Sequence, residues 1–250
     1  MTKSKFTRRN VLAISAAIAV VPGTALSQSI FNQAEDLLNS VTGGAGGAVD
    51  LSNADITGAF KEALRFGTEA VTSVLGGDGG FLNDPAVHIP LPDNLRKVQD
   101  VLKPLGFGAL GDDVETRLNR AAEAAMPQAG NILIDSISQM TLDDARGILD
   151  GPDDAATQYL ERVSGTSIAS ALRPIIDDTL AQVGAIQALD AMLSQYKSIP
   201  FVPDVKANLT EHAVTLALSG LFLYLASEEA DIRKDPGRWT TDLLKKVFGS

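Results

Sequence analysis

The stretch LTEHAVTLALSGLFLYLASEEADIR, residues 209–233, decides the fold. Between residues 213 and 226 nearly every position is apolar, so a helix drawn through this run has no polar side. A helix that is apolar all round belongs at the centre of a core or in a membrane. These fourteen residues are too few to cross a bilayer, which needs about 20. The stretch therefore predicts the central buried helix of a helical domain.

Capping and turn residues divide the rest of the chain into further helices. Asn208 with Glu211 three positions later predicts a capping box for the hydrophobic helix, and Asp235-Pro236 predicts its end. Further helices are expected over 52–75, 93–104, 112–126, 128–139 after a break or kink at Pro127, 142–149, 152–160, 167–183, 185–196 and 239–248. No run of alternating β-branched residues occurs, so the predicted fold is all-α. We expect a single compact multi-helix bundle around the hydrophobic helix.

A long glycine-rich loop, GGDGGFLNDPAVHIPLP, is expected at residues 76–92. Its apolar residues predict that it packs over the core instead of standing in solvent. His88 lies inside this loop, and His212 lies in the first turn of the hydrophobic helix beside Glu211. Because neither histidine has a recognisable metal partner in the sequence, both are interpreted as structural.

The composition narrows the class of function. The 250-residue chain has no cysteine, which excludes disulfides, thiolate zinc sites, iron–sulfur clusters and cysteine nucleophiles. The formal net charge is −10, and without the first 27 residues it is −14, from 17 basic and 31 acidic residues. Such a surface repels nucleic acid and anionic membranes, so neither is an expected partner. No integral membrane span is expected after the leader is removed.

Residues 1–27 have the three parts of an export signal, namely a basic start, an apolar run and a small-residue exit. The segment TRRNVL at residues 7–12 resembles the twin-arginine form, although an ordinary Sec signal that contains two arginines is also open. We therefore expect a periplasmic or secreted product. Residues 28–50 then predict an amphipathic helix followed by a flexible Gly-rich linker, and residues 51–250 predict the helical domain.

Seven stretches of the chain resemble, in order, a bacterial family catalogued as domain of unknown function 4197. They are GAFKEALRFGTEAV (58–71), GFLNDPAVHIPLP (80–92), LNRAAEAAMPQA (118–129), GILDGPDDAATQYL (147–160), LRPIIDDTLAQVGA (172–185), YKSIPFVP (196–203) and EEADIRKDPGRWTTDLLKKVFG (228–249). The resemblance covers residues 52–249. It implies an exported, mostly helical bacterial domain, and it supplies no catalytic residue.

Four Asp-Asp pairs are the most conspicuous candidates for chemistry, at residues 112–113, 143–144, 153–154 and 177–178. The first three pairs lie in the opening turn of an expected helix, and the fourth lies near a helix start if the chain breaks at Pro174. The helix dipole favours negative charge at such a start, so helix capping explains all four. The densest group is Asp150, Asp153 and Asp154, which could bind a divalent cation. This group lacks the alternating ligands and the closing Glu of an EF-hand loop.

No G-x-S-x-G, H-E-x-x-H or P-loop motif occurs, so no hydrolase, zinc protease or nucleotide-binding reading has support, and no cofactor is predicted. The charged segment at residues 228–234 is typical of a solvated helix end. The sequence favours a binding or structural module of the periplasm or cell envelope, with a protein or small-molecule partner. The alternative is a carboxylate- or metal-dependent enzyme that uses acidic residues at 150–154 or 228–231.

Overall fold

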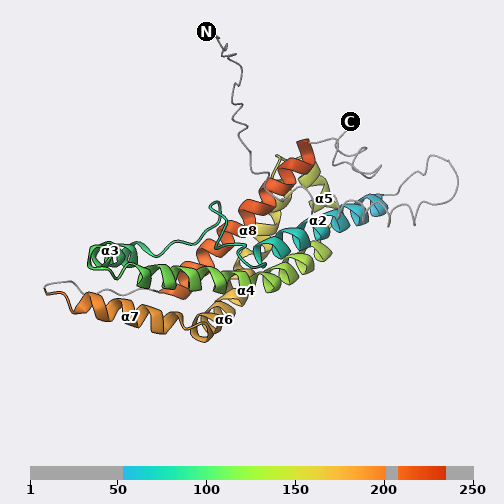
Figure 1. Cartoon of the computed structure of the whole chain (residues 1–250). Helices are drawn as coiled ribbons and strands as arrows, with labels where there is room; N and C mark the ends of the chain where they lie inside the picture. Colours follow the sequence, from blue (N-terminus) through green and yellow to red (C-terminus); the bar gives the residue numbers. More distant parts are fainter. Residues whose placement is uncertain (1–52, 201–207, 235–250) are drawn as a thin grey trace, which may run out of the picture.

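The computed structural model describes residues 53–200 and 208–234, a region that is 81% helical and has no strands (Figure 1). The predicted all-α fold is therefore confirmed. The elements are α2 (Asn53–Leu75), α3 (Asp93–Leu102), the short 3-10 helix η1 (Lys103–Leu105), α4 (Ala109–Gln139), α5 (Leu142–Leu149), α6 (Ala155–Gln182), α7 (Ala185–Lys197) and α8 (Leu209–Lys234). The expected leader, the linker at 28–50 and the C-terminal helix at 239–248 lie outside the described residues.

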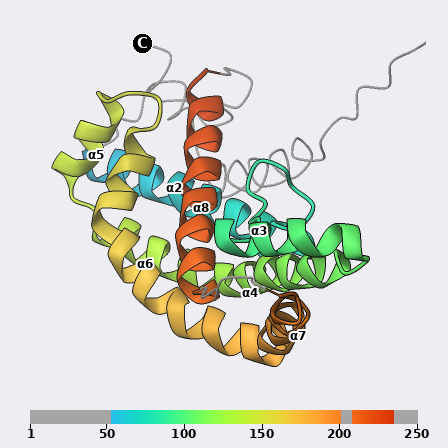
Figure 2. The same ribbon diagram turned by 90° about the vertical axis from the view of Figure 1, so that its left-hand side faces the viewer.

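Helix α4 has the largest number of neighbours, because it packs against α2, α3, α6, α7 and α8. Its buried face is rich in small residues, among them Ala121, Ala122 and Ala125, and small side chains let neighbouring helices approach closely. Helix α8 packs mainly against α6 and α2. In Figure 2 α8 stands upright in front of α2, while α6 curves around one side of the bundle.

Two helices run through prolines. The expected break or kink at Pro127 does not end a helix, since α4 continues to Gln139, and the two helices expected at 152–160 and 167–183 are one helix, α6, which contains Pro174. A proline inside a helix removes one backbone hydrogen bond and crowds the preceding turn. Both prolines are exposed, while Met126, next to Pro127, is buried. Core packing on the opposite side thus keeps each helix intact.

The hydrophobic helix predicted from residues 209–233 is α8, and it is buried on one side. Thr215, Ser219 and Leu223 follow one another at four-residue spacing on its open side, and Leu223 is 52% exposed. By length and composition α8 is the one helix of the described region that could span a membrane, and 44% of its apolar window is buried inside the fold. A core helix meets the same criterion.

The capping predictions hold in part. Thr141 and Asp144 form a complete capping box at α5. At α8 the side chain of Asn208 accepts the N–H of Glu211 at 3.0 Å, but the Glu211 carboxylate turns to Arg173 at 2.7 Å. One half of the predicted box therefore exists, and the other half is replaced by an ion pair.

Candidate functional site

A small apolar pocket lies between α2, α6 and α8. Its volume is about 60 Å³. The side chains that surround it are mostly apolar and come from all three helices; they include Phe60, Leu64, Leu160, Leu225 and Ile232. Gly67 of α2 also lines the pocket, and a Cβ at this position would meet no atom within 4 Å. The missing side chain at residue 67 thus contributes to the empty space.

One end of the pocket is polar and is formed by Glu229 and Arg233 of α8. Arg233 Nη2 lies 3.0 Å from Glu229 Oε1, and the two side chains are only 9% and 10% exposed. The Glu229 carboxylate also accepts the backbone N–H groups of Ala156 and Thr157 and the hydroxyl of Thr157, each at 2.9 Å. Arg233 in turn donates to the carbonyl of Ile148 at 2.8 Å.

This arrangement corrects the expectation of a solvated helix end at residues 228–234. Glu229 and Arg233 are largely buried, because α8 lays this turn over the start of α6 and the end of α5. A carboxylate at the N-terminus of a helix satisfies free N–H groups and interacts favourably with the helix dipole. One sequence signal could have predicted this buried ion pair. Glu229 and Arg233 are four residues apart, with the apolar Ile232 between them.

The structure brings the two acidic segments 150–154 and 228–231 together, although 74 or more residues separate them in the chain. Lys234 Nζ lies 2.7 Å from Asp153, and this ion pair lowers the pKa of the Asp153 carboxyl. Asp154 accepts a hydrogen bond from Gln158 at 2.9 Å, and Asp150 is exposed.

Metal binding by Asp150, Asp153 and Asp154 therefore stays a prediction. Within the ranges 53–200 and 208–234, no group of three or more histidines and carboxylates is arranged to hold a metal ion. Of the other aspartate pairs, Asp144 acts as a capping residue, and the hydrogen bonds from Thr141 lower its pKa. Asp113 pairs with Arg117, and Asp177 accepts the hydroxyl of Thr210. The capping explanation is wrong for Asp177 and Asp178, because α6 runs unbroken from Ala155 to Gln182 and this pair lies near its end.

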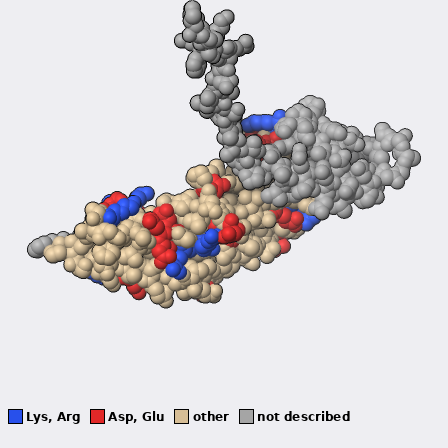
Figure 3. Space-filling model, viewed as in Figure 1, with Lys and Arg blue, Asp and Glu red and all other residues tan. Residues whose placement is uncertain are grey.

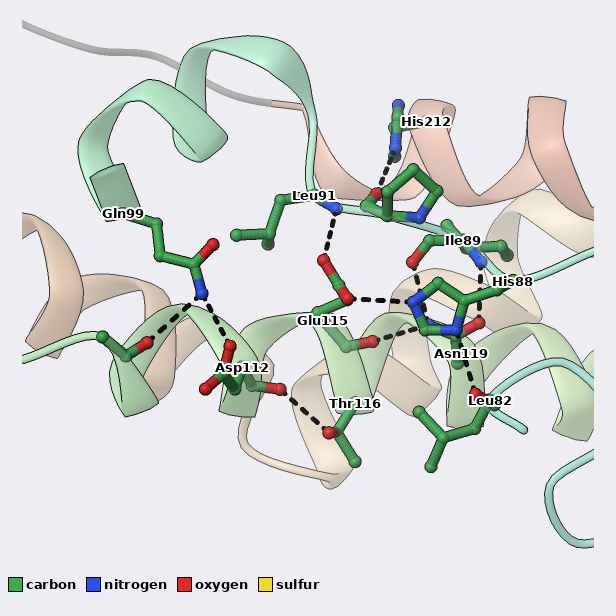
Figure 4. A network of polar contacts seen from close by, with 12 residues as sticks. Leu82, His88, Ile89, Leu91, Gln99, Asp112, Glu115, Thr116, Asn119 and His212 are labelled. Atoms are coloured by element: carbon green, nitrogen blue, oxygen red, sulfur yellow. Dashed lines mark hydrogen bonds and ion pairs between the residues drawn. The ribbon is translucent and has the colours of Figure 1, made fainter. Parts of the chain in front are cut away.

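The loop 76–92 is held against α4 and α8 by a second polar network (Figure 4). Asn119 of α4 accepts the N–H of Ile89 at 2.9 Å and donates to the carbonyl of the same residue at 2.8 Å. His88 lies 2.9 Å from Glu115, whose second oxygen accepts the N–H of Leu91. His212 of α8 lies 2.8 Å from the carbonyl of Pro90.

The same loop is anchored further along by Glu123, a buried carboxylate that accepts the N–H groups of Phe81 and Leu82 at 3.2 and 3.1 Å. The apolar residues Phe81, Val87, Ile89 and Leu91 are buried. The predictions that the loop packs over the core and that His88 is a hydrogen-bonded loop residue are thus confirmed. These networks position the backbone of the loop 76–92, because the polar groups in them hydrogen-bond to one another.

The surface seen in Figure 3 carries acidic and basic side chains interspersed among larger uncharged areas. In the described region several charged residues form partly exposed ion pairs within one helix, such as Arg65 with Glu62 and Glu69. Such pairs contribute little to stability, roughly 0–1 kcal/mol each. The pocket between α2, α6 and α8 is therefore considered as a candidate binding site of the described region.

Comparison with known proteins gives one result. Residues 50–249 match the model of a family described as a protein of unknown function, DUF4197, while no curated protein and no solved structure matches the chain. The matched range agrees with the resemblance seen over residues 52–249, and it includes every described helix. The chain therefore belongs to the DUF4197 family.

Proposed function

We propose that this chain is an exported binding module of the bacterial cell envelope, and that the pocket between α2, α6 and α8 receives an apolar group of its ligand. The observation that carries the proposal is an unfilled, mostly apolar space of about 60 Å³ between three helices. Protein interiors are packed as densely as organic crystals, so an open apolar space of this kind marks a place where another group fits.

The size of the pocket limits what enters it. An engineered cavity of about 150 Å³ lined by apolar side chains binds benzene. A pocket of about 60 Å³ is less than half as large, and therefore suits a group between a methyl and an isopropyl in size. The rest of a larger ligand would lie outside it.

The engaged state of the nearby acidic groups favours binding over catalysis. A catalytic carboxylate has to reach a substrate atom, commonly with a pKa matched to its task. The carboxylate of Glu229 is instead used by four donors, namely Arg233, two backbone N–H groups and the hydroxyl of Thr157. Asp153 and Asp154 are likewise paired with polar side chains.

Xenon provides a direct test, since it is an apolar sphere that enters small cavities. The chain without residues 1–27 would be labelled in its leucine methyl groups and followed by NMR under xenon pressure. We expect saturable shifts at Leu64, Leu160 and Leu225. Gly67→Leu, which fills the pocket, should abolish them, whereas Gly165→Leu, at a half-buried position of α6 that does not line the pocket, should not. Shifts that are absent, or that survive in Gly67→Leu, would contradict the proposal.

The exported location is tested separately. The basis for it is the three-part signal in residues 1–27, with Arg8 and Arg9 in a twin-arginine arrangement. Replacing both arginines by lysine should retain the protein in the cytoplasm of a bacterial host, as followed by cell fractionation. Unchanged export would reject the twin-arginine route and keep the signal peptide, whereas deletion of residues 2–27 should prevent export by either route.

A second candidate follows from the closeness of segments 150–154 and 228–231. The observation in its favour is that Asp153 and the last turn of α8 meet at one edge of the bundle. A metal-dependent protein would use Asp150, Asp153 and Asp154 as oxygen ligands there. Calorimetric titration of the full mature chain with calcium and magnesium decides this, because no heat at millimolar metal would end the idea.

A further inference from the structure

Thr68 of α2 has a hydroxyl group with no hydrogen-bond partner among the described residues. Seven polar or charged residues of the described region are buried: Thr68, Thr72, Gln99, Asn119, Glu123, Thr157 and Ser164. The other six make side-chain hydrogen bonds, but Thr68 Oγ1 has no partner, although the residue is only 1% exposed. A buried polar group without a hydrogen bond is destabilising, because it has lost its hydration and gained no partner, so this exception needs an explanation.

Its neighbours on the helices show how easily the hydroxyl could have been satisfied. Thr72, one turn further along α2, donates to the carbonyl of Thr68 at 2.8 Å, and the buried Ser164 donates to the carbonyl four residues before it. This bond to the preceding turn is the ordinary solution for a hydroxyl inside a helix. The Thr68 hydroxyl does not make this bond to the carbonyl of Leu64, four residues before it. Both Thr68 and Leu64 line the pocket.

Water is a poor partner for Thr68 in this place. A buried water molecule is stable when it finds two to four polar partners, and the walls around Thr68 are mainly apolar. An organic group that combines alkyl carbons with a single oxygen matches such walls better. It buries its carbons against Leu64 and Leu225 and exchanges one hydrogen bond with Thr68.

The charges at the pocket select against an anion. Among the described residues that line the pocket, the carboxylates of Glu228 and Glu229 outnumber the single guanidinium, that of Arg233. A ligand carboxylate would add like charge at this end and lose its hydration. The hydroxyl of Thr68, which both donates and accepts, suits a neutral alcohol or carbonyl oxygen.

From these observations we infer that the ligand is a neutral molecule which places a short or branched alkyl group in the pocket and one hydroxyl or carbonyl oxygen on Thr68. The inference rests on the proposed function, because it specifies the chemistry of the same pocket. Thr68 then acts as the residue that distinguishes an oxygen-bearing ligand from a purely hydrocarbon one.

Two probes of nearly equal shape test this role in the full mature chain. They are 2-methyl-1-propanol and 2-methylbutane, in which a methyl group replaces the hydroxyl. NMR titration of the labelled methyl groups gives a Kd for each probe. In Thr68→Val, which keeps the shape and loses the hydroxyl, the alcohol affinity relative to the hydrocarbon should fall about 3- to 10-fold. Thr68→Ser, which keeps the hydroxyl, should retain most of the relative affinity for the alcohol.

Thr72→Val is the matched control. Thr72 is also a buried threonine of α2, but its hydroxyl is used by the carbonyl of Thr68, so its replacement should leave the ratio of the two affinities unchanged. A melting curve of each variant confirms that it is folded. In addition, 2-methylpropanoate should bind the native chain at least 10-fold more weakly than the alcohol.

The outcomes separate the two proposals. If both probes bind and Thr68→Val leaves their affinity ratio as it was, the hydroxyl takes no part in recognition, and the inference is wrong while the pocket remains a binding site. If neither probe nor xenon binds, the proposed function fails first. If the affinity for the alcohol relative to the hydrocarbon falls in Thr68→Val but not in the control Thr72→Val, the inference stands.

Discussion

The carboxylate of Glu229 accepts the backbone N–H of Ala156 at 2.9 Å, so the last turns of α8 cap the first turn of α6, 73 residues earlier in the chain. The same carboxylate binds Arg233, which reaches on to the carbonyl of Ile148 at the end of α5. One ion pair therefore joins three helix ends at the polar end of the pocket. This connection fixes the distance between α6 and α8, which form two of the pocket walls.

Glu229→Ala should strongly destabilise the fold. It leaves the N–H groups of Ala156 and Thr157 without their carboxylate acceptor and removes the partner of a largely buried guanidinium. Breaking a buried ion pair from one side costs about 3–5 kcal/mol, and we expect a decrease of this size in the free energy of unfolding measured with urea.

Glu211→Ala is the matched control for that experiment. Glu211 also belongs to α8 and also pairs with an arginine, but it and Arg173 are 51% and 49% exposed. An exposed pair contributes about 0–1 kcal/mol, so this variant should unfold at nearly the native urea concentration. Equal losses in the two variants would show that the buried position of Glu229 has no special effect.

Asn119→Ala should loosen the loop 76–92. Asn119 is fully buried and satisfies both the N–H and the carbonyl of Ile89, so its removal leaves two buried backbone groups unpaired. The expected cost is about 2–4 kcal/mol. Hydrogen exchange at the amide of Ile89 should become faster by more than the loss of global stability explains. Exchange at amides in the middle of α6 should change only as much as the global stability does. Unchanged exchange at Ile89 would contradict the assignment.

The helix positions were largely predictable from the sequence, whereas the partners of each helix were not. Gly76, Thr141 and Gly184 mark boundaries that the structure retains, because caps and turns act locally. At Pro127 the local rule that proline ends a helix was overridden by packing, since this proline is exposed while Met126 beside it is buried. Helix α6 likewise continues through residues 161–166, where the sequence predicted two separate helices. Tertiary contacts decide such cases, and a local pattern does not contain them.

The pocket itself was beyond prediction, because it depends on which three helix faces meet. Thr68 appears in the sequence as an ordinary polar residue on an amphipathic helix. Its importance follows from burial beside α6 and α8, which are more than 80 residues away in the chain. Likewise, the polar stripe of Thr215 and Ser219 on α8 was visible at four-residue spacing but was outweighed by the surrounding apolar residues.

Tyr224→Phe should change how stability depends on alkaline pH. The hydroxyl of Tyr224 donates to the Asp84 carboxylate, and burial, reinforced by the Asp84 hydrogen bond and charge, raises the pKa of Tyr224 to about 12. The unfolded chain releases this proton near pH 10. The native state thus holds the proton more tightly, and the associated stability is complete below pH 10 and lost as the pH rises toward 12.

The native chain should therefore lose stability more steeply than Tyr224→Phe between pH 10 and pH 12. The measurement is the urea midpoint at a series of alkaline pH values, with tyrosinate absorbance as a direct record of ionisation. Asp84→Asn is the companion variant, since it removes the negative charge and should lower the pKa of Tyr224. Parallel pH profiles for native and Tyr224→Phe proteins would show that this tyrosine does not titrate differently on folding.

Gly220→Ala should destabilise the contact between α8 and the loop 76–92. A Cβ at this buried position would lie 3.0 Å from a ring carbon of Phe81 and 3.1 Å from two side-chain carbons of Val87. Real Cβ atoms rarely approach other atoms so closely, so the loop or the helix has to move. Overpacking of a dense core costs about 1–3 kcal/mol, which exceeds the gain of up to about 1 kcal/mol that alanine gives over glycine inside a helix.

Gly165→Ala isolates that helical gain, because the nearest atom to a Cβ at residue 165 is the Cγ of Glu161 at 3.9 Å. This variant should raise the free energy of unfolding by about 0.5–1 kcal/mol, while Gly220→Ala lowers it. Opposite signs for the same substitution in two helices can arise only from their surroundings, and thermal melts of the two proteins read the signs directly. If both variants were stabilised, α8 would have room at Gly220, and Phe81 and Val87 could not be packed against it as described.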